Sequence, residues 1–231
     1  MPEIIPISNC KTCLFKSLIF QQLNKDELEF MDQYKTEKKY KKGEVVVGEG
    51  DIINEFLYLK TGLVKLFKTG YDGKDHILSI AKPLDFIGFL SVFSNTNYQY
   101  SITAIEDSVL CFVDLVSLKK VIEQNGKFAM EVLNKMSLAL DDILGTRISL
   151  CSRNLRGRIA IMLLYFSDEV YHNDEFELPL TRKEIAGLIE MTTENVIRIL
   201  SEFRKDKLIA ISGSRIQILN KKFMEAISEV G

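Results

Sequence analysis

The chain has 231 residues, of which 46% are hydrophobic and 27% are charged, and its formal net charge at pH 7 is −2. These values are ordinary for a globular protein and sufficient for two domains. No stretch approaches the ~18–20 apolar residues of a membrane span. The first residues, MPEIIPISNCKTC, lack the basic region and apolar run of a signal peptide. We therefore expect a cytoplasmic protein without a membrane partner, whose four cysteines are reduced thiols unless they bind a metal or sense redox state.

The N-terminal segment contains a C-x-x-C pair, Cys10 and Cys13, ahead of a short capped helix predicted over Asn24–Tyr34. Two cysteines cannot complete a metal site on their own. The pair therefore leaves open a metal or redox role and an ordinary role as thiols.

Residues 40–115 alternate short β-rich segments with glycines, which predicts a small barrel or roll. The expected strands are Val45–Val47, Phe56–Leu59, Leu63–Phe67 and Ile77–Ile80, with a hairpin turn at Tyr71–Lys74. An aromatic cluster follows, made of Phe86, Phe89, Phe93, Tyr98 and Tyr100. The cluster fits either the core of the roll or an apolar effector pocket, which could suit haem or another hydrophobic signal. His76 fits a surface histidine better than a haem ligand.

A long helix is predicted over Phe128–Leu150, followed by a second over Asn154–Tyr171. Apolar residues recur on the first helix at the spacing of a coiled-coil seam, interrupted by Arg147: Ala129, Leu133, Met136, Leu140, Ile143 and Leu150. The seam favours a parallel two-helix dimer contact over burial against the chain's own roll. A hinge is expected near Ser149–Asn154, close to Cys151.

Two helix-start signals follow closely, and they predict a helix-turn-helix. Thr181 and Glu184 form a T-x-x-E capping box, and Thr192 can cap a second helix that begins at Thr193. The second helix should bury one face, made of Val196, Ile199, Leu200 and Phe203. Its other face carries Thr193, Glu194, Ile197, Arg198 and Ser201. Carboxylate, guanidinium and aliphatic groups on such a face can contact base edges, and Glu194 and Arg198 can orient each other across one turn.

Leu208–Ile211, a glycine turn and Arg215–Leu219 read as a two-stranded wing, with Arg215 placed to contact phosphate. Residues 181–222 contain nine Lys and Arg against five Asp and Glu, a net charge of +4 within a chain of −2. A basic C-terminal module on an acidic body is typical of a nucleic-acid-binding end.

The sequence TRKEIAGLIEMTTENVIRIL and the wing after it resemble the winged helix-turn-helix of the Crp/Fnr transcription regulators. The glycine-punctuated segment from Lys42 to Lys65 resembles the cyclic-nucleotide-binding β-roll of the same family. The resemblance implies that Glu194 and Arg198 are the family's Glu-x-x-x-Arg reading pair. Ile197 stands where Fnr-like readers carry Ser and Crp-like readers carry Gly. The DNA contacts that we expect are Arg182, Thr192, Thr193, Glu194, Asn195, Ile197, Arg198 and Arg215.

The resemblance also bears on the effector. Family members that bind cyclic AMP use Gly-Glu-Leu and Arg-Ser segments, which correspond here to Gly88, Phe89 and Leu90 and to Tyr100 and Ser101. Phe89 cannot accept a ribose hydrogen bond and Tyr100 brings no charge to the phosphate, so the usual mode of cyclic AMP binding is not expected. Cys10, Cys13 and Cys111 match three cysteine positions of Fnr-type iron–sulfur regulators, but the pattern's next N-terminal cysteine is missing near Ile19.

The sequence thus predicts an α+β fold: a double-stranded jelly-roll sensor domain (1–126), a dimerisation helix (127–152) and a winged helix-turn-helix (153–231). The expected function is that of a homodimeric transcription regulator on palindromic double-stranded DNA, with RNA polymerase as a further partner if it activates. The alternative is a cyclic-nucleotide-type regulatory protein that does not bind specific DNA. The sequence shows no nucleophile elbow, Walker loop, HExxH or Rossmann fingerprint, so we do not expect an enzyme.

Overall fold

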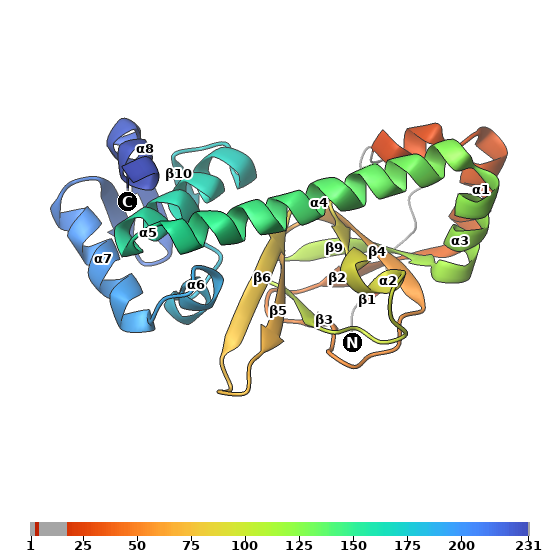
Figure 1. The fold of residues 1–231 in the computed structure, drawn as a ribbon, viewed down its shortest axis with the longest axis horizontal. Helices are drawn as coiled ribbons and strands as arrows, with labels where there is room; N and C mark the ends of the chain where they lie inside the picture. The colour runs from red at the N-terminus through yellow and green to blue at the C-terminus, as the bar shows by residue number, and fades with distance from the viewer. Residues whose placement is uncertain (1–2, 5–17, 231) are drawn as a thin grey trace. The chain divides into compact units, whose positions relative to one another are not determined.

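The computed structural model of the chain describes residues 3–4 and 18–230 (Figure 1). The chain forms two compact units. The first consists of Met1–Lys68 and Leu78–Asp142, and the second of Thr69–Ile77 and Ile143–Gly231. Among the described helices, none is long and apolar enough to cross a membrane.

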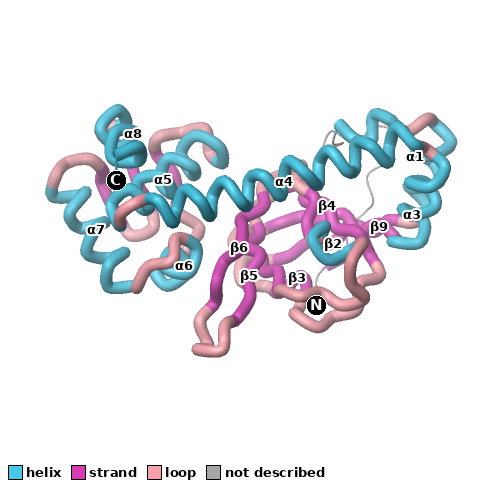
Figure 2. Tube along the Cα trace, viewed as in Figure 1, coloured by secondary structure: helices cyan, strands magenta, loops and turns pink. Residues whose placement is uncertain are grey.

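The first unit contains most of the described strands, arranged in two antiparallel sheets (Figure 2). Two of these strands, β5 and β6, extend into the segment Thr69–Ile77 of the second unit. The five-stranded sheet has the order β1-β2-β9-β4-β7 and the four-stranded sheet the order β3-β8-β5-β6. The strands are β1 Glu3–Ile4, β2 Lys35–Tyr40, β3 Val45–Val47, β4 Glu55–Thr61, β5 Val64–Thr69, β6 Asp75–Ala81, β7 Phe86–Ile87, β8 Ser101–Ala104 and β9 Ser108–Asp114. The predicted roll is confirmed.

Short helices flank the two sheets. They are a 3₁₀ turn at Leu18–Gln22, α1 Lys25–Gln33, α2 Phe89–Val92 and α3 Leu115–Gln124. Asn24 and Glu27 form a reciprocal capping box that starts α1, and the Asp114 carboxylate accepts from the backbone N–H of Ser117 at 2.7 Å to start α3.

The five-stranded sheet also contains a buried ion pair. The Nζ of Lys60 on β4 lies 2.7 Å from an Oε2 oxygen of Glu37 on β2, and both side chains are almost fully buried. Strand β9 separates the two, pairing with β2 from Lys35 opposite Val113 to Tyr40 opposite Ser108.

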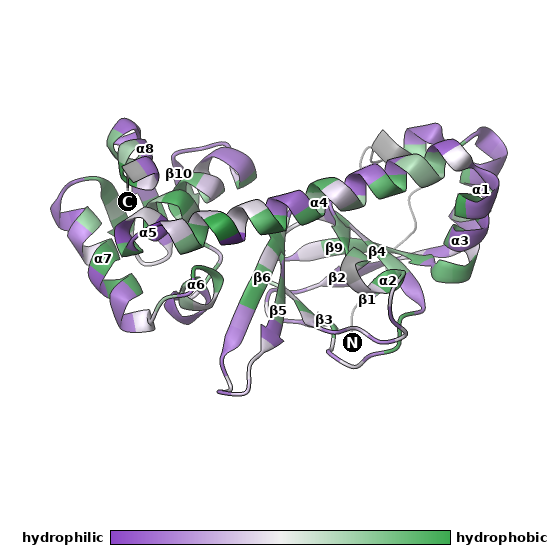
Figure 3. Ribbon diagram, in the orientation of Figure 1, coloured by the Kyte–Doolittle hydropathy of each residue, from purple (hydrophilic) through white to green (hydrophobic). Residues whose placement is uncertain are grey.

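The long helix α4 runs from Gly126 to Ser152, slightly beyond the predicted range. Phe128 and Val132 are buried, and the Phe128 ring packs on Phe20 with centroids 6.1 Å apart. The green bands along α4 in Figure 3 mark its apolar residues. Several of these residues are exposed. The residues of this exposed stripe are Met130, Leu133, Leu140, Leu144 and Ile148.

The predicted seam on α4 needs correction. Of its six residues only Leu133 and Leu140 belong to the exposed stripe, and Ala129, Met136 and Ile143 are half-buried. Leu150 is buried within its own chain, so it cannot belong to an exposed seam. Arg147, the interruption in the pattern, forms an ion pair with Glu190 inside the second unit. The last two turns of α4 therefore belong to the second unit, and the exposed stripe ends at Ile148.

The second unit is mainly helical. Its elements are α5 Leu155–Tyr165, a π-helical segment Phe166–Val170, β10 Glu175–Glu177, α6 Arg182–Leu188, α7 Thr193–Lys205, β11 Ile209–Ser212, β12 Arg215–Ile218 and α8 Lys221–Val230. The helix predicted over Asn154–Tyr171 is thus an α-helix capped by Asn154 that continues as π-helix. Strand β10 adds a third strand to the predicted wing, pairing with β12 from Glu175 opposite Gln217 to Glu177 opposite Arg215.

Two glycines of the roll allow a direct test of its packing. Gly62 and Gly43 both have positive φ, +83° and +90°. A Cβ on Gly62 would lie 2.5 Å from the carbonyl oxygen of Asp107, whereas a Cβ on Gly43 would meet nothing within 4 Å. Gly43→Ala should cost about 1–2 kcal/mol of left-handed strain. Gly62→Ala should cost roughly 1–3 kcal/mol more, because Ser108 and Asp107 must move. Urea denaturation of both variants measures the difference, and equal losses would contradict the packing.

Candidate nucleic-acid interface

Helix α6 begins as the capping box predicts. The Thr181 hydroxyl accepts from the backbone N–H of Glu184 at 3.2 Å, and the Glu184 carboxylate accepts from the N–H of Thr181 at 2.8 Å. Leu180 and Ile185 flank this capping box as a hydrophobic staple, and both are buried. Helix α7 is capped by Thr192, whose hydroxyl accepts from the N–H of Asn195 at 3.3 Å. Both predicted starts are confirmed.

The turn between α6 and α7 passes through Glu190, which has a left-handed φ of +53°. The N–H of Met191 donates to the carbonyl of Ala186 at 3.0 Å, closing a Schellman-type helix end. The Arg158 side chain on α5 donates to the carbonyls of Ile189 and Glu190 at 3.3 and 3.0 Å. Together with the ion pair from Arg147, these contacts hold Glu190 in the left-handed conformation that Gly or Asn usually adopts at a helix end.

Helix α7 separates into a buried and a solvent-facing side. Val196, Ile199, Leu200 and Phe203 are buried, as predicted. Thr192, Glu194, Ile197, Arg198 and Ser201 are exposed, and Thr193 and Asn195 are half-buried. Ile197 is 51% exposed, an unusual setting for a large aliphatic side chain. The solvent-facing side therefore presents the residue types that can contact base edges.

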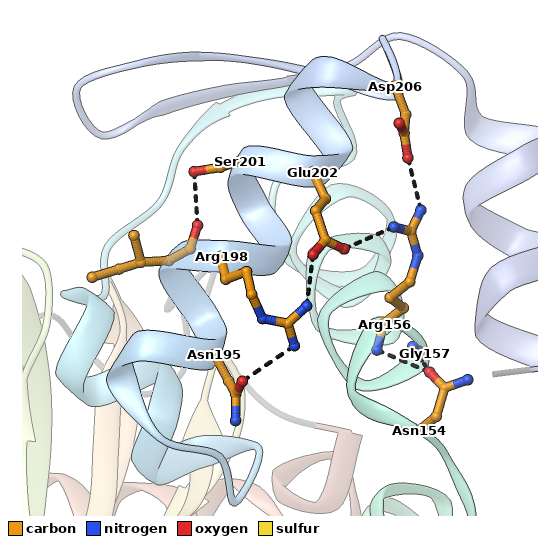
Figure 4. Close-up of polar contacts among 9 residues, drawn as sticks. Asn154, Arg156, Gly157, Asn195, Arg198, Ser201, Glu202 and Asp206 are labelled. Atoms are coloured by element: carbon orange, nitrogen blue, oxygen red, sulfur yellow. Dashed lines mark hydrogen bonds and ion pairs between the residues drawn. The ribbon is translucent and has the colours of Figure 1, made fainter.

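Arg198 is not oriented by Glu194, as the one-turn spacing had suggested. Its guanidinium donates instead to Glu202 Oε1 at 2.6 Å and to Asn195 Oδ1 at 3.2 Å (Figure 4). Glu194 lies in the first turn of α7, where its carboxylate accepts from its own backbone N–H and from the Thr192 hydroxyl. These two hydrogen bonds lower the pKa of Glu194 below its ordinary value. A carboxylate in the first turn also interacts favourably with the helix dipole.

The network around Arg198 extends to α5. Arg156 donates through Nη1 to Glu202 Oε2 and through Nη2 to Asp206 Oδ2, both at 3.0 Å (Figure 4). Its guanidinium carbon also lies 4.8 Å from the centre of the Phe203 ring. Sequence reasoning assigned no role to Arg156, Glu202 or Asp206. The one available signal was Glu202, four residues after Arg198 on the same helix.

The other predicted contacts lie on neighbouring elements. Arg215 starts β12 beside the turn at Gly213, is largely exposed, and has its Nη1 3.4 Å from Glu175 Oε1. An ion pair this exposed is weak, so the side chain can exchange its partner for a phosphate at little cost. Arg182, at the start of α6, is half-buried, and burial lowers its pKa.

The candidate effector residues pack among themselves. Phe89, Tyr98 and Tyr100 are buried, and the Tyr98 and Tyr100 rings meet edge to face with centroids 6.2 Å apart. A Cβ on Gly88 would come within 2.9 Å of the Tyr98 ring. Burial raises the pKa of Tyr98, whose hydroxyl donates to the carbonyl of Glu55 at 3.4 Å.

The remaining two candidate effector residues, Ser101 and Leu90, carry no charge. Ser101 is engaged as well, since its hydroxyl accepts from the N–H of Glu49 at 3.0 Å. The side chain of Leu90 lies outside the described residues. In the aromatic cluster, Phe86 is buried and Phe93 is exposed. The buried rings fit the core interpretation of this cluster better than an open pocket.

Cys10 and Cys13 lie outside the described residues, so the three-cysteine match stays a prediction. Cys111 is buried on β9, and Cys151 is exposed at the end of α4. Within residues 3–4 and 18–230, no group of three or more His, Cys, Asp or Glu side chains is arranged to hold a metal ion. His76 is half-exposed, with its Nε2 3.9 Å from Asp72 Oδ1.

Both halves of the chain match known protein domains. Residues 37–125 match the cyclic nucleotide-binding domain, and residues 157–227 match the Crp-like helix-turn-helix domain. The fumarate and nitrate reduction regulatory protein of Vibrio cholerae is 25% identical over 218 residues, covering 92% of this chain and 87% of that protein. The anaerobic regulatory protein of Bacillus subtilis is 27% identical over 205 residues, covering 87% of this chain and 86% of that protein.

Solved structures show the same fold. FixK2 from Bradyrhizobium japonicum has a TM-score of 0.76 at 23% identity, over 85% of this chain and 98% of its own. A transcriptional regulator of the CRP/FNR family from Thermus thermophilus has a TM-score of 0.66 at 22% identity, over 84% and 98%.

The buried rings generate a prediction about nucleotide binding. Cyclic AMP should show no micromolar affinity for the chain, because Phe89 offers no acceptor to the ribose and Tyr100 no charge to the phosphate. Titration calorimetry with cyclic AMP checks this directly. Binding at about −8 kcal/mol or better would show that the roll opens to a nucleotide after all.

Proposed function

Because the chain belongs to the Crp/Fnr family of transcription regulators, we propose that it reads a palindromic DNA site as a homodimer, with α7 as the reading helix. The observation that carries this proposal is the solvent-facing side of α7. There Ile197 and Arg198 stand exposed in the second turn of a helix that is capped at Thr192. Reading helices of this class place their N-terminal turns in the major groove. In this function the protein binds DNA and catalyses no reaction.

The roles of individual residues follow from their chemistry. Arg198 suits a guanine edge, Glu194 a cytosine amino group and Ile197 a thymine methyl. Thr192, Thr193 and Asn195 at the helix start, Arg182 on α6 and Arg215 in the wing suit phosphate oxygens. All of these residues lie within residues 157–227, which match the Crp-like helix-turn-helix domain.

The exposed stripe on α4 supports the homodimer. Met130, Leu133, Leu140, Leu144 and Ile148 recur at intervals close to three and four residues, with Ser137 in the one polar position. Pairing two copies of this stripe would remove the exposed apolar surface from water. Two-fold symmetry would then present two α7 helices to half-sites about 34 Å apart.

The signal sensed by the roll is a separate part of the proposal. The names of the relatives, which include an anaerobic regulatory protein, support a redox or oxygen-linked signal over cyclic AMP. A cytoplasmic location, and RNA polymerase as a partner of an activating form, remain predictions. The competing function, a roll that regulates without reading DNA, is separated by the DNA-binding measurement below.

Arg198 and Arg215 should affect DNA binding differently. Arg198→Ala should cost roughly 1–3 kcal/mol on the selected site and much less on random DNA, because a base contact is lost. Arg215→Ala should weaken both DNAs alike and lower the salt slope by about one, because a phosphate contact is lost. Ile197→Ser should shift the preference at one position of each half-site without abolishing binding. Selection from a random pool, followed by titration at several salt concentrations, measures all three. Full sequence preference in Arg198→Ala would mean that α7 is not the reader.

Leu140→Glu should dissociate the homodimer. The substitution places a carboxylate in the middle of the α4 stripe without a partner, at an expected cost of several kcal/mol. Leu138→Glu provides the control, because Leu138 is also exposed but lies on the opposite side of α4 from Leu140. Sedimentation should show one chain for Leu140→Glu and two for Leu138→Glu. Two chains in both variants would exclude the stripe as the dimer contact.

A further inference from the structure

Glu202 is shared by two arginines from different helices. Its Oε1 accepts from Arg198 Nη1 on α7 at 2.6 Å, and its Oε2 accepts from Arg156 Nη1 on α5 at 3.0 Å (Figure 4). Both oxygens are therefore engaged by guanidinium groups, which form strong charge-assisted hydrogen bonds. The carboxylate cannot rotate away from Arg198 without also breaking its contact with Arg156.

The preferences of an isolated helix do not favour Glu202 at this position. It lies in the last turn of α7, where the negative end of the helix dipole opposes a carboxylate. An Arg four residues before a Glu is also the weaker order for such a pair. Arg156 compensates from outside the helix. It is fixed in turn by the Asn154 cap of α5, by Asp206 and by the Phe203 ring.

The arrangement has a consequence for Arg198. Its side chain is more than half exposed and long, so on a bare helix surface it would sample many rotamers. Glu202 and Asn195 each accept from one of its two Nη groups, which fixes the plane of the guanidinium. A guanidinium has five N–H donors in all, so donors remain for a base edge. Fixing the group beforehand reduces the entropy lost when it meets that edge.

We propose that Glu202, held in place by Arg156, is a positioning residue for DNA reading that orients Arg198 before DNA is bound. This inference rests on the proposed role of α7 as the reading helix. Glu202 thereby increases discrimination between sequences, while its negative charge lowers affinity for DNA of every sequence.

The test compares two variants of the full chain, each with one carboxylate neutralised in the same network. Glu202→Gln removes the orienting charge, whereas Asp206→Asn removes an equal charge that contacts Arg156 and not Arg198. Each is titrated with the duplex selected by the wild type and with a random duplex of equal length. Both variants should bind random DNA more tightly. The ratio of the two affinities should fall about tenfold in Glu202→Gln and much less in Asp206→Asn, in which Arg156 keeps its contacts with Glu202 and the Phe203 ring. An equal fall in both would reduce the effect to charge and overturn the proposal.

Two further variants separate positioning from charge and from the reading role itself. Arg156→Lys keeps the net charge but cannot reproduce the two-pronged contact, so the ratio should fall while affinity for random DNA stays constant. In an Arg198→Ala background, Glu202→Gln should lower the ratio no further, because the group that it orients is gone. A further tenfold fall there would sink the proposal. If Arg198→Ala alone leaves the ratio intact, the reading role of α7 fails first and takes this inference with it.

Discussion

The orientation of α7 depends on the reversal of the chain at Glu190. A left-handed backbone at a residue with a side chain costs about 1–2 kcal/mol. The cost is met by contacts that converge on the turn: Arg158 donates to its carbonyls, Arg147 pairs with the Glu190 carboxylate, and Met191 closes the end of α6. A turn held from three directions fixes the angle at which the second helix leaves the first.

Helix α5 holds α7 at both ends. Arg158 contacts the carbonyls just before α7 begins, and Arg156 contacts Glu202 and Asp206 where it ends. Both arginines are placed by one local signal, the Asn154 side chain that caps α5. The solvent-facing side of α7 is thus supported on a rigid base, which is what a constellation of reading groups requires.

Much of this molecule could be predicted where the signal is local. The caps at Thr181 and Thr192 are read from residues three positions apart, and the alternation of strands and glycines indicated the roll. Predictions failed where the partner is distant in sequence. The spacing of apolar residues along α4 did not show that Leu150 is buried. Spacing on α7 offered Arg198 both Glu194 and Glu202, each four residues away, and it could not show which one is used, because Arg156, which holds Glu202, comes from another helix. The exposed face of the candidate site was therefore predictable, but the support beneath it was not.

The buried pair of Lys60 and Glu37 has a consequence for how the roll folds. Side chains alternate between the faces of a strand, so a slip of β2 by one residue against β9 would turn Glu37 to the opposite face. Lys60 would then lose the Glu37 carboxylate, and breaking a buried ion pair costs roughly 3–5 kcal/mol. A sheet in which β2 pairs with β9 in this shifted register is therefore less stable. The ion pair therefore favours the native register of β2 against β9 over a register shifted by one residue.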